Sequence, residues 1–381
     1  MRGARALRIA RRGPRKVSLA LNGITRRVGA DLHIAQTSVE LASEGFNVLL
    51  GTTLAGKTTL MQLMAGLLRP NAGTVHFGGR DVTGVAVQRR NVAMVYQQFI
   101  NYPNMSVFEN IASPLRVAGV SRGEIRRRVG TIAELLQLSH LLERRPAELS
   151  GGQQQRTAMA RALVKDADLV LLDEPLANLD YKLREGLRDE LPRLFAGRDC
   201  TVVYATTEPT EALLLGGHVA TLHEGQITQF GPAAEVYRRP RDLRTAQVFS
   251  DPPMNTARVT KQGGRVRLGE FAAWRLPAGY ASMPDGEYTF ALRPHHVLPA
   301  SIVADGAQRV RVGGRVLIGE ISGSESVAHF ELGGQTWVSL AHGVHRLAVG
   351  EPAQFDLDVV HGLYFDADDR LVANAAPAHG G

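Results

Sequence analysis

The sequence predicts two folded domains of different class: an α/β domain with a largely parallel sheet, then a smaller all-β domain. At 381 residues, 44% apolar and 21% charged, the chain exceeds the usual size of one hydrophobic core. Up to about residue 235 short apolar runs alternate with helix-period stretches, whereas from about Arg241 apolar and polar residues alternate. We place the domains at residues 17–240 and 241–381, after a basic extension at residues 1–16.

Four short apolar runs are expected to be doubly buried strands of the first domain. They are residues 46–50, 91–96, 169–172 and 202–205. Between them, Ser121 and Glu124 have capping-box spacing at the start of a helix. A second helix carries an apolar stripe that Pro70 stops, formed by Leu60, Leu63, Met64, Leu67 and Leu68.

The all-β domain is predicted from strict alternation in residues 288–292 and 355–359. Glycine pairs at 263–264, 313–314 and 333–334 are expected to form turns between its strands.

The charge distribution argues against a nucleic-acid partner. Seven basic residues within the first sixteen account for the whole net charge of +7, so the remaining chain is neutral. The extension lacks the apolar segment of a secretory signal, and we expect a disordered tail or a misassigned start codon rather than a transit peptide. The single cysteine, Cys200, is expected to be buried. Nowhere do eighteen apolar residues run together, so a membrane role would require a partner.

Residues 51–58, Gly-Thr-Thr-Leu-Ala-Gly-Lys-Thr, fit the pattern GxxxxGK[ST] between a predicted strand and a predicted helix. Backbone N–H groups of such a P-loop wrap phosphates, Lys57 reaches the β- and γ-phosphates, and the Thr58 hydroxyl binds Mg²⁺. The pattern predicts an ATP site formed by Gly51, Thr52, Thr53, Leu54, Ala55, Gly56, Lys57, Thr58 and Thr59.

The predicted strand 169–172 ends in two carboxylates, Asp173 and Glu174. Ligands of such sheets bind beyond the carboxyl ends of the strands, where Asp173 can hold Mg²⁺ and Glu174 can polarise the attacking water. The alternative is a helix cap after a core strand.

Ser150 and Gln153 have capping-box spacing, while Gly151 and Gly152 leave the following N–H groups bare, which makes an anion site; the alternative is an ordinary capped helix. Together with the P-loop and the two carboxylates, this signature segment resembles the ABC ATPases. In that family the segment caps the γ-phosphate of ATP bound to a partner subunit.

The resemblance implies further roles. Gln97 matches the Q-loop, which senses the γ-phosphate and the metal and faces the permease, and Asp180 ends the segment 176–180 that matches the D-loop. Aromatic and apolar residues after Gln97 stand where the family receives a coupling helix, although they equally fit a core: Phe99, Tyr102, Met105 and Phe108.

Residues 231–255, 291–296 and 363–366 resemble the carbohydrate and polyol importer branch, in which the β domain is an OB-like regulatory domain. Residues 53–58 and 204–209 are similar to ATPases of glycerol or glycerol-phosphate importers.

Two positions depart from the family. Thr207 stands where the family carries a switch histidine, and a threonine hydroxyl is shorter and stays uncharged near neutral pH. Val28 stands where an aromatic ring usually stacks on adenine.

We therefore expect an ATP- and Mg²⁺-dependent subunit on the cytoplasmic membrane face, driving a permease that a solute-binding protein serves indirectly. Thr207 favours a different second ATPase as partner, although a homodimer is also possible. One alternative is a nucleotide-gated regulatory subunit with little turnover. A soluble ABC protein of translation or DNA repair would need tandem ATPase halves or a long coiled coil, and neither is present.

Overall fold

The computed structural model describes residues 18–43, 45–177, 179–302 and 309–372, so the predicted extension at residues 1–16 lies outside the described part. The chain divides into two units between Phe230 and Gly231. The boundary predicted from sequence stands at residue 240. In the structure α7 (Ala233–Arg238) belongs with the second unit. The Arg293 guanidinium lies 3.8 Å from the centre of the Tyr237 ring and donates to the Tyr237 carbonyl.

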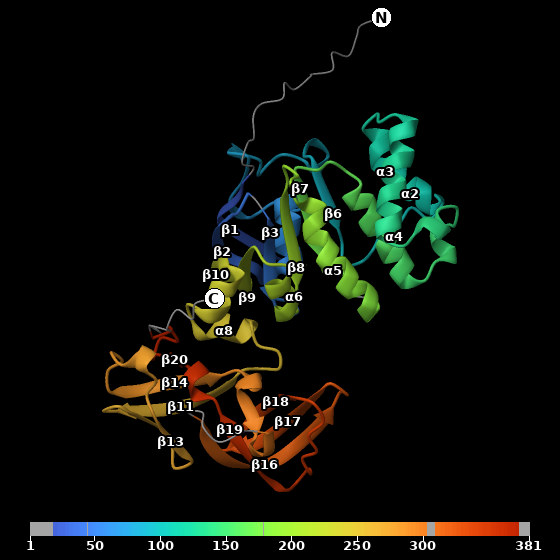
Figure 1. The fold of residues 1–381 in the computed structure, drawn as a ribbon. Coiled ribbons are helices and arrows are strands. Elements are labelled where there is room, and N and C mark those ends of the chain that lie inside the picture. The colour runs from blue at the N-terminus through green and yellow to red at the C-terminus, as the bar shows by residue number, and fades with distance from the viewer. Residues whose placement is uncertain (1–17, 44, 178, 303–308, 373–381) are drawn as a thin grey trace, which may run out of the picture. The chain divides into compact units, whose positions relative to one another are not determined.

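A six-stranded sheet forms the centre of the first unit, in the order β10-β9-β3-β8-β7-β6 (Figure 1). β3 pairs in parallel with β8 and β9, and β7 pairs in parallel with β6 and β8. The four predicted strands are β3, β6, β7 and β8, each within one residue at either end. The bounds are β3 Phe46–Gly51, β6 Val92–Val95, β7 Leu169–Asp173, β8 Thr201–Thr206, β9 His218–His223 and β10 Gln226–Pro232.

An antiparallel sheet in the order β2-β1-β4-β5 and helix α1 (Lys57–Ala65) share one core with the central sheet. Leu19 and Leu21 of β1 pack there with Leu60 of α1 and Val203 of β8. The bounds are β1 Leu19–Val28, β2 Asp31–Leu41, β4 Ala72–Phe77 and β5 Arg80–Asp81.

Helix α1 ends earlier than its apolar stripe predicts. Gly66 takes a left-handed conformation at φ 79° and caps the helix, so Leu67 lies outside it and is 39% exposed. The glycine, rather than Pro70, stops this helix.

Three helices, α2 (Val107–Val117), α3 (Arg122–Leu135) and α4 (Gly151–Leu163), pack against one another as a helical subdomain (Figure 1). Ser121 caps α3 as predicted, accepting a hydrogen bond from the Glu124 amide. The unit also contains α5 (Tyr181–Phe195) and α6 (Pro209–Leu214). Among the described residues, no helix combines the length and apolar character needed to cross a membrane.

The second unit starts with α7 and α8 (Leu243–Val248), and two antiparallel five-stranded sheets follow. The sheets enclose a common aromatic core that includes Trp274, Phe290, Phe330 and Phe355. The strand bounds are β11 Asn255–Gln262, β12 Arg265–Leu268, β13 Ala272–Arg275, β14 Gly286–Leu292, β15 Val297–Pro299, β16 Val310–Ile321, β17 Glu325–Leu332, β18 Gln335–His342, β19 Pro352–Leu357 and β20 Leu363–Phe365.

One predicted turn is wrong. The pairs 263–264 and 333–334 connect adjacent strands, but 313–314 lies inside β16. A Cβ atom on Gly314 would meet the Phe330 ring at 2.4 Å and the Glu331 carbonyl oxygen at 2.6 Å. The glycine therefore permits close packing of the strand instead of a turn.

Candidate nucleotide-binding site

The P-loop joins β3 to α1, and its glycines are needed where the chain is crowded. A Cβ atom on Gly51 would lie 2.6 Å from the Leu222 carbonyl oxygen. Gly56 has φ 101° and stands directly before α1 without a side-chain cap. The first N–H groups of the helix are thus free of side-chain acceptors and can receive an anion. Leu54, at φ 67°, is 97% exposed at the tip of the loop.

Lys57 is buried at the base of this loop. Its Nζ donates to the carbonyl oxygens of Gly51 at 2.9 Å and Thr52 at 3.1 Å, and lies 3.4 Å from Glu174 Oε1. Burial lowers the pKa of Lys57, while the Glu174 carboxylate acts in the opposite direction. The ammonium group is therefore held beside the phosphate-binding backbone by partners that a nucleotide phosphate can replace.

Thr58 and Asp173 form an oxygen-rich pair next to Lys57. Thr58 Oγ1 donates to Asp173 Oδ2 at 2.7 Å. Within the described residues, the other oxygen, Asp173 Oδ1, is buried and has no hydrogen-bond partner. Burial raises the pKa of Asp173, and this outweighs the lowering by the Thr58 hydrogen bond and by the charge of Lys57. Hydroxyl and carboxylate oxygens are ligands that Mg²⁺ prefers, so this pair fits that ion.

Glu174 begins the segment after β7 in a strained conformation, at φ 46°. Its backbone N–H donates to the Ala205 carbonyl oxygen of β8 at 3.0 Å, which fixes the turn. Gln97 Nε2 donates to Glu174 Oε2 at 3.3 Å, so Lys57 and Gln97 hold opposite oxygens of one carboxylate. The sheet thus brings Gln97, Asp173 and Glu174 to the P-loop.

Of the predicted residues, Lys57, Thr58, Gln97 and Glu174 line a cavity of about 570 Å³ together with Thr53, Leu54, Gly56 and Thr59 and with segments that sequence reasoning missed. Asp173 does not line it but is hydrogen-bonded to Thr58, and Gly51, Thr52 and Ala55 of the loop do not line it either. The additional walls are Asp31, Leu32 and His33 of β2, and Glu224 and Gly225 between β9 and β10. The turn formed by Glu224 and Gly225 is held in place by two backbone hydrogen bonds. The Gly225 N–H donates to the Ala55 carbonyl, and the Ala35 N–H donates to the Gly225 carbonyl. Glu224-Gly225 between apolar runs is a recognisable turn signal, but nothing local places it against the P-loop.

Comparison with known proteins decides the family. Over 93% of its length this chain is 34% identical to the sn-glycerol-3-phosphate import ATP-binding protein UgpC of Pectobacterium atrosepticum, covering 98% of that protein. The chain belongs to the ABC transporter ATP-binding proteins. It is also 36% identical, over 86% of its length, to the trehalose/maltose import ATP-binding protein MalK of Thermococcus litoralis, covering 92% of that protein.

The ABC transporter family model matches residues 34–177, which include the P-loop, Gln97, the signature segment and Glu174. A solved structure, the ATP-binding cassette MJ0796 bound to ADP and Pi in a post-hydrolysis state, is similar at TM-score 0.52 and 25% identity. The similar region covers 56% of this chain and 98% of the chain in that structure. The predicted fold is confirmed: an α/β ABC ATPase fold with a helical subdomain, followed by an all-β, OB-like domain. The named relatives are import subunits, which supports the importer interpretation and not the regulatory alternative.

Other residues predicted from the ABC pattern stand apart from this cavity. Ser150 Oγ accepts from the Gln153 N–H at 3.4 Å, and Gln153 Oε1 accepts from the Ser150 N–H at 2.9 Å, completing the predicted capping box of α4. Asp180 caps α5 by accepting from the Leu183 N–H at 3.0 Å. Thr207 is exposed directly after β8. The P-loop cavity is lined by none of Ser150, Gln153, Asp180 and Thr207. Val28 does not line it either, whereas Leu32 does.

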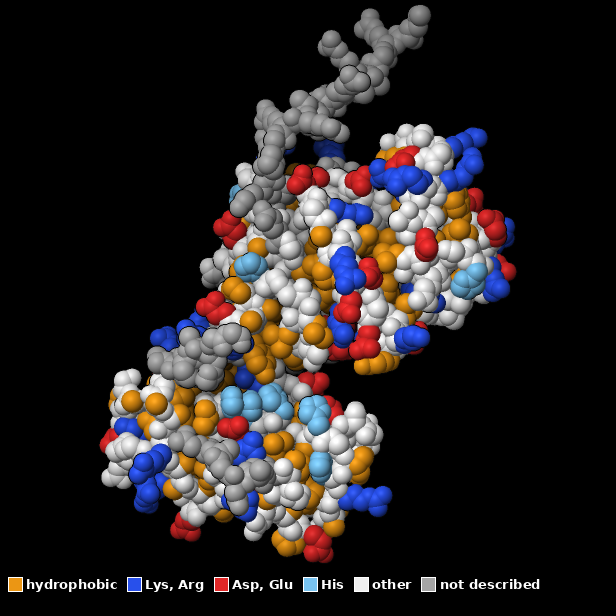
Figure 2. Space-filling view, viewed as in Figure 1, with side chains coloured by type: hydrophobic (Ala, Val, Ile, Leu, Met, Phe, Trp, Pro, Cys, Tyr) orange, Lys and Arg blue, Asp and Glu red, His pale blue; other side chains and the backbone are white. Residues whose placement is uncertain are grey.

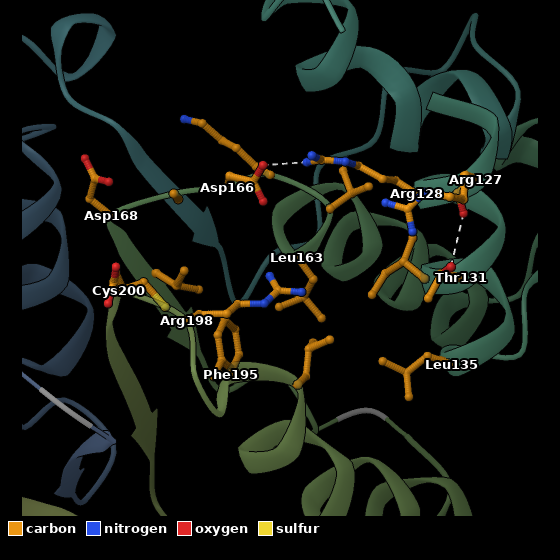
Figure 3. Close-up of a pocket in the computed structure, with 17 residues that line it drawn as sticks. Arg127, Arg128, Thr131, Leu135, Leu163, Asp166, Asp168, Phe195, Arg198 and Cys200 are labelled. Carbon is orange, nitrogen blue, oxygen red and sulfur yellow. Dashed lines mark hydrogen bonds and ion pairs between the residues drawn. The ribbon is translucent and has the colours of Figure 1, made fainter. Parts of the chain in front are cut away.

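A second cavity of about 490 Å³ lies by the start of β7, away from the P-loop (Figure 3). Arg128 Nη1 pairs with Asp166 Oδ2 at 2.5 Å across it. Burial raises the pKa of Cys200 in its wall, which keeps this thiol protonated, as expected of a structural cysteine. Because Arg128 already has a carboxylate partner, this cavity is less suited to a nucleotide than the P-loop cavity.

Proposed function

We propose that this chain binds and hydrolyses ATP to drive a membrane permease that imports a small sugar, polyol or glycerol phosphate. The observation that carries the proposal is that Lys57, Thr58, Gln97 and Glu174 line one cavity, with Asp173 hydrogen-bonded to Thr58. The printed names of the relatives, import ATP-binding proteins for sn-glycerol 3-phosphate and for trehalose or maltose, support the solute class. The chain would sit peripherally on the cytoplasmic face of the membrane.

Each of these five residues has a proposed role. Lys57 exchanges its contact with Glu174 for the β- and γ-phosphates, since the carboxylate and the phosphates both offer anionic oxygens to the ammonium group. Thr58 and Asp173 would hold Mg²⁺, which neutralises phosphate charge when bound, and Gln97 would complete that contact. Glu174, released from Lys57, becomes available to accept a proton from the attacking water.

The signature segment is proposed to act on a second subunit. Ser150 to Gln153 present an exposed helix N-terminus that does not line this chain's own cavity. An anion site of this kind is suited to the γ-phosphate of ATP bound elsewhere. Two ATPase subunits arranged head to tail would therefore form two composite sites, each with one P-loop and one signature segment.

We further propose that the second subunit is a different ATPase. Thr207 cannot act as a charged switch residue, so a homodimer would lack the switch histidine in both composite sites. Purifying the assembled transporter and weighing its intact subunits tests this directly. Two copies of this chain alone, with full ATPase activity, would refute the heterodimer and leave the importer function intact.

The importer function is tested in proteoliposomes containing the purified transporter. We expect ATP-dependent uptake of labelled glycerol 3-phosphate, a polyol or a disaccharide, and its loss in the Lys57→Ala variant. Uptake that proceeds equally well without ATP would overturn the proposal.

A further inference from the structure

Two histidines and one aspartate gather in the second unit, which contains none of the residues proposed for the ATPase chemistry. One ligand atom each of His296, Asp358 and His361 lies within 4.8 Å of the other two. This is the candidate metal-binding group found among the described residues. Histidine side chains also gather on the face of this unit shown in Figure 2. His296 lies 62 positions before Asp358 in the sequence, whereas Asp358 and His361 are three positions apart.

The backbone holds these residues in a fixed frame. His296 ends the 3-10 turn Pro294–His296, and Asp358 directly precedes the 3-10 turn Val359–His361. The Asp358 N–H donates to the His296 carbonyl oxygen at 2.9 Å, and the His361 N–H donates to the Asp358 carbonyl oxygen at 3.2 Å. On either side, Val297 of β15 pairs with Leu357 of β19. The backbone that carries the three side chains is therefore ordered by these hydrogen bonds before any ligand binds.

The side-chain chemistry is that of a transition-metal site. His361 Nδ1 lies 3.3 Å from Asp358 Oδ2, and the His296 and His361 rings stack at 4.2 Å between centroids. Tetrahedral ligands 2.0–2.2 Å from one zinc ion are about 3.4 Å apart, so the first pair is already at that spacing. Because the two rings are nearly parallel, His361, whose side chain is 56% exposed, would have to turn out of the stack for both rings to direct a nitrogen at a common ion.

The surroundings of His296 limit the affinity of this site for a cation. Arg293 and Arg309 both act on His296 with a positive charge, which opposes a bound cation.

We propose that His296, Asp358 and His361 bind one divalent transition-metal ion of the zinc class, with the remaining coordination position open to water. Two imidazoles and one carboxylate are a ligand set that zinc, cobalt and nickel accept, whereas calcium and magnesium prefer oxygen ligands alone. The ion would join the turn before β15 to the turn before β20.

The test uses the metal-free full-length chain, with Co²⁺ as the spectroscopic probe and Zn²⁺ as the competitor, in excess Mg²⁺ to occupy oxygen sites. We expect one equivalent of Co²⁺ to give the visible absorption of a low-coordinate nitrogen and oxygen site, and Zn²⁺ to abolish it. His361→Ala, at an exposed position, and Asp358→Asn should each weaken binding at least about tenfold.

Two controls keep the result interpretable. His295→Ala removes a ring that lies 4.2 Å from that of His296, tilted by 51°, but is outside the ligand set. His140→Ala removes an exposed histidine of the first unit, and both variants should bind Co²⁺ as the unchanged chain does. Thermal melting of each metal-free variant confirms folding. No Co²⁺ spectrum with the unchanged chain, or an unchanged spectrum with His361→Ala, would overturn the proposal.

Discussion

Helices α1 and α4 of the first unit both offer a helix N-terminus to an anion, but they prepare it in opposite ways. Helix α1 starts after Gly56 with no side-chain cap, inside a cavity that also contains Lys57. Helix α4 starts after Ser150, whose side chain and that of Gln153 are both bonded to the helix's own backbone, on an exposed surface.

The difference indicates which end can act alone. At α1, backbone N–H groups, the Lys57 ammonium group and the Glu174 carboxylate border one space, so this chain itself contains most of the ligands proposed for ATP. At α4, the side chains serve the helix and only the glycine N–H groups remain for an external anion. One end is a nearly complete site, and the other is a surface that needs a partner.

The largest expected effect is at the complete site. Lys57→Ala removes the positive charge that lies beside both the loop carbonyls and Glu174, and we expect ATPase activity of the assembled transporter to fall by roughly 10³-fold. Phosphate release is the measurement, and Lys182→Ala, an exposed lysine on α5, is the matched control. Uptake at the unchanged rate with Lys57→Ala would contradict the site assignment.

The next effect tests the signature end. Ser150→Arg places a large cation on the exposed N-terminus of α4, and we expect roughly 10²-fold slower hydrolysis by the assembled transporter, while ATP still binds the isolated chain. Ser121→Arg on α3 is a close control, because Ser121 accepts from its third helical N–H at 3.4 Å just as Ser150 does. Equal losses from both variants would mean that the defect is helix capping alone.

Glu174→Gln is expected to have a smaller effect in this chain than the corresponding change in the partner subunit. If Thr207 makes this P-loop site a poor catalyst, turnover falls by roughly 10-fold or less here and by 10²-fold or more for the partner's glutamate. ATPase rates of the two single variants decide the point. Equal losses would show that both composite sites turn over.

The smallest effect is expected for Thr207→His. Restoring an imidazole directly after β8 should raise turnover by roughly two- to tenfold and make Glu174→Gln more damaging than it is in the unchanged chain. Thr206 is buried and bonded to Glu211, so Thr207 is the position that can be changed without disturbing the strand. A rate that stays the same would indicate that Thr207 is not a defect.

Contiguous patterns were predictable from sequence because their function depends on local geometry. The P-loop, the Asp173-Glu174 strand end and the Ser150 cap each need only a few neighbouring residues in a set order. Three buried strands of the parallel sheet, β3, β7 and β8, were predictable for the same reason, since apolar runs of that length bury on both faces. The predicted burial of β6 on both faces is wrong, because β6 lies at the edge of the sheet and only Ala93 and Val95 in it are buried. Local crowding was not predictable, so Gly314 was assigned to a turn although it lies within a strand beside Phe330.

Sequence by itself thus determined the family pattern, four strands of the parallel sheet and the residues proposed to contact nucleotide. Only the tertiary structure decided which residues meet: Gln97 with Glu174, the β9–β10 turn with the P-loop, and His296 with Asp358 and His361. The physical reason is that neighbouring strands in a sheet need not be neighbours in sequence. The order β10-β9-β3-β8-β7-β6 sets the first two contacts and the pairing of β15 with β19 sets the third, and no local propensity encodes either.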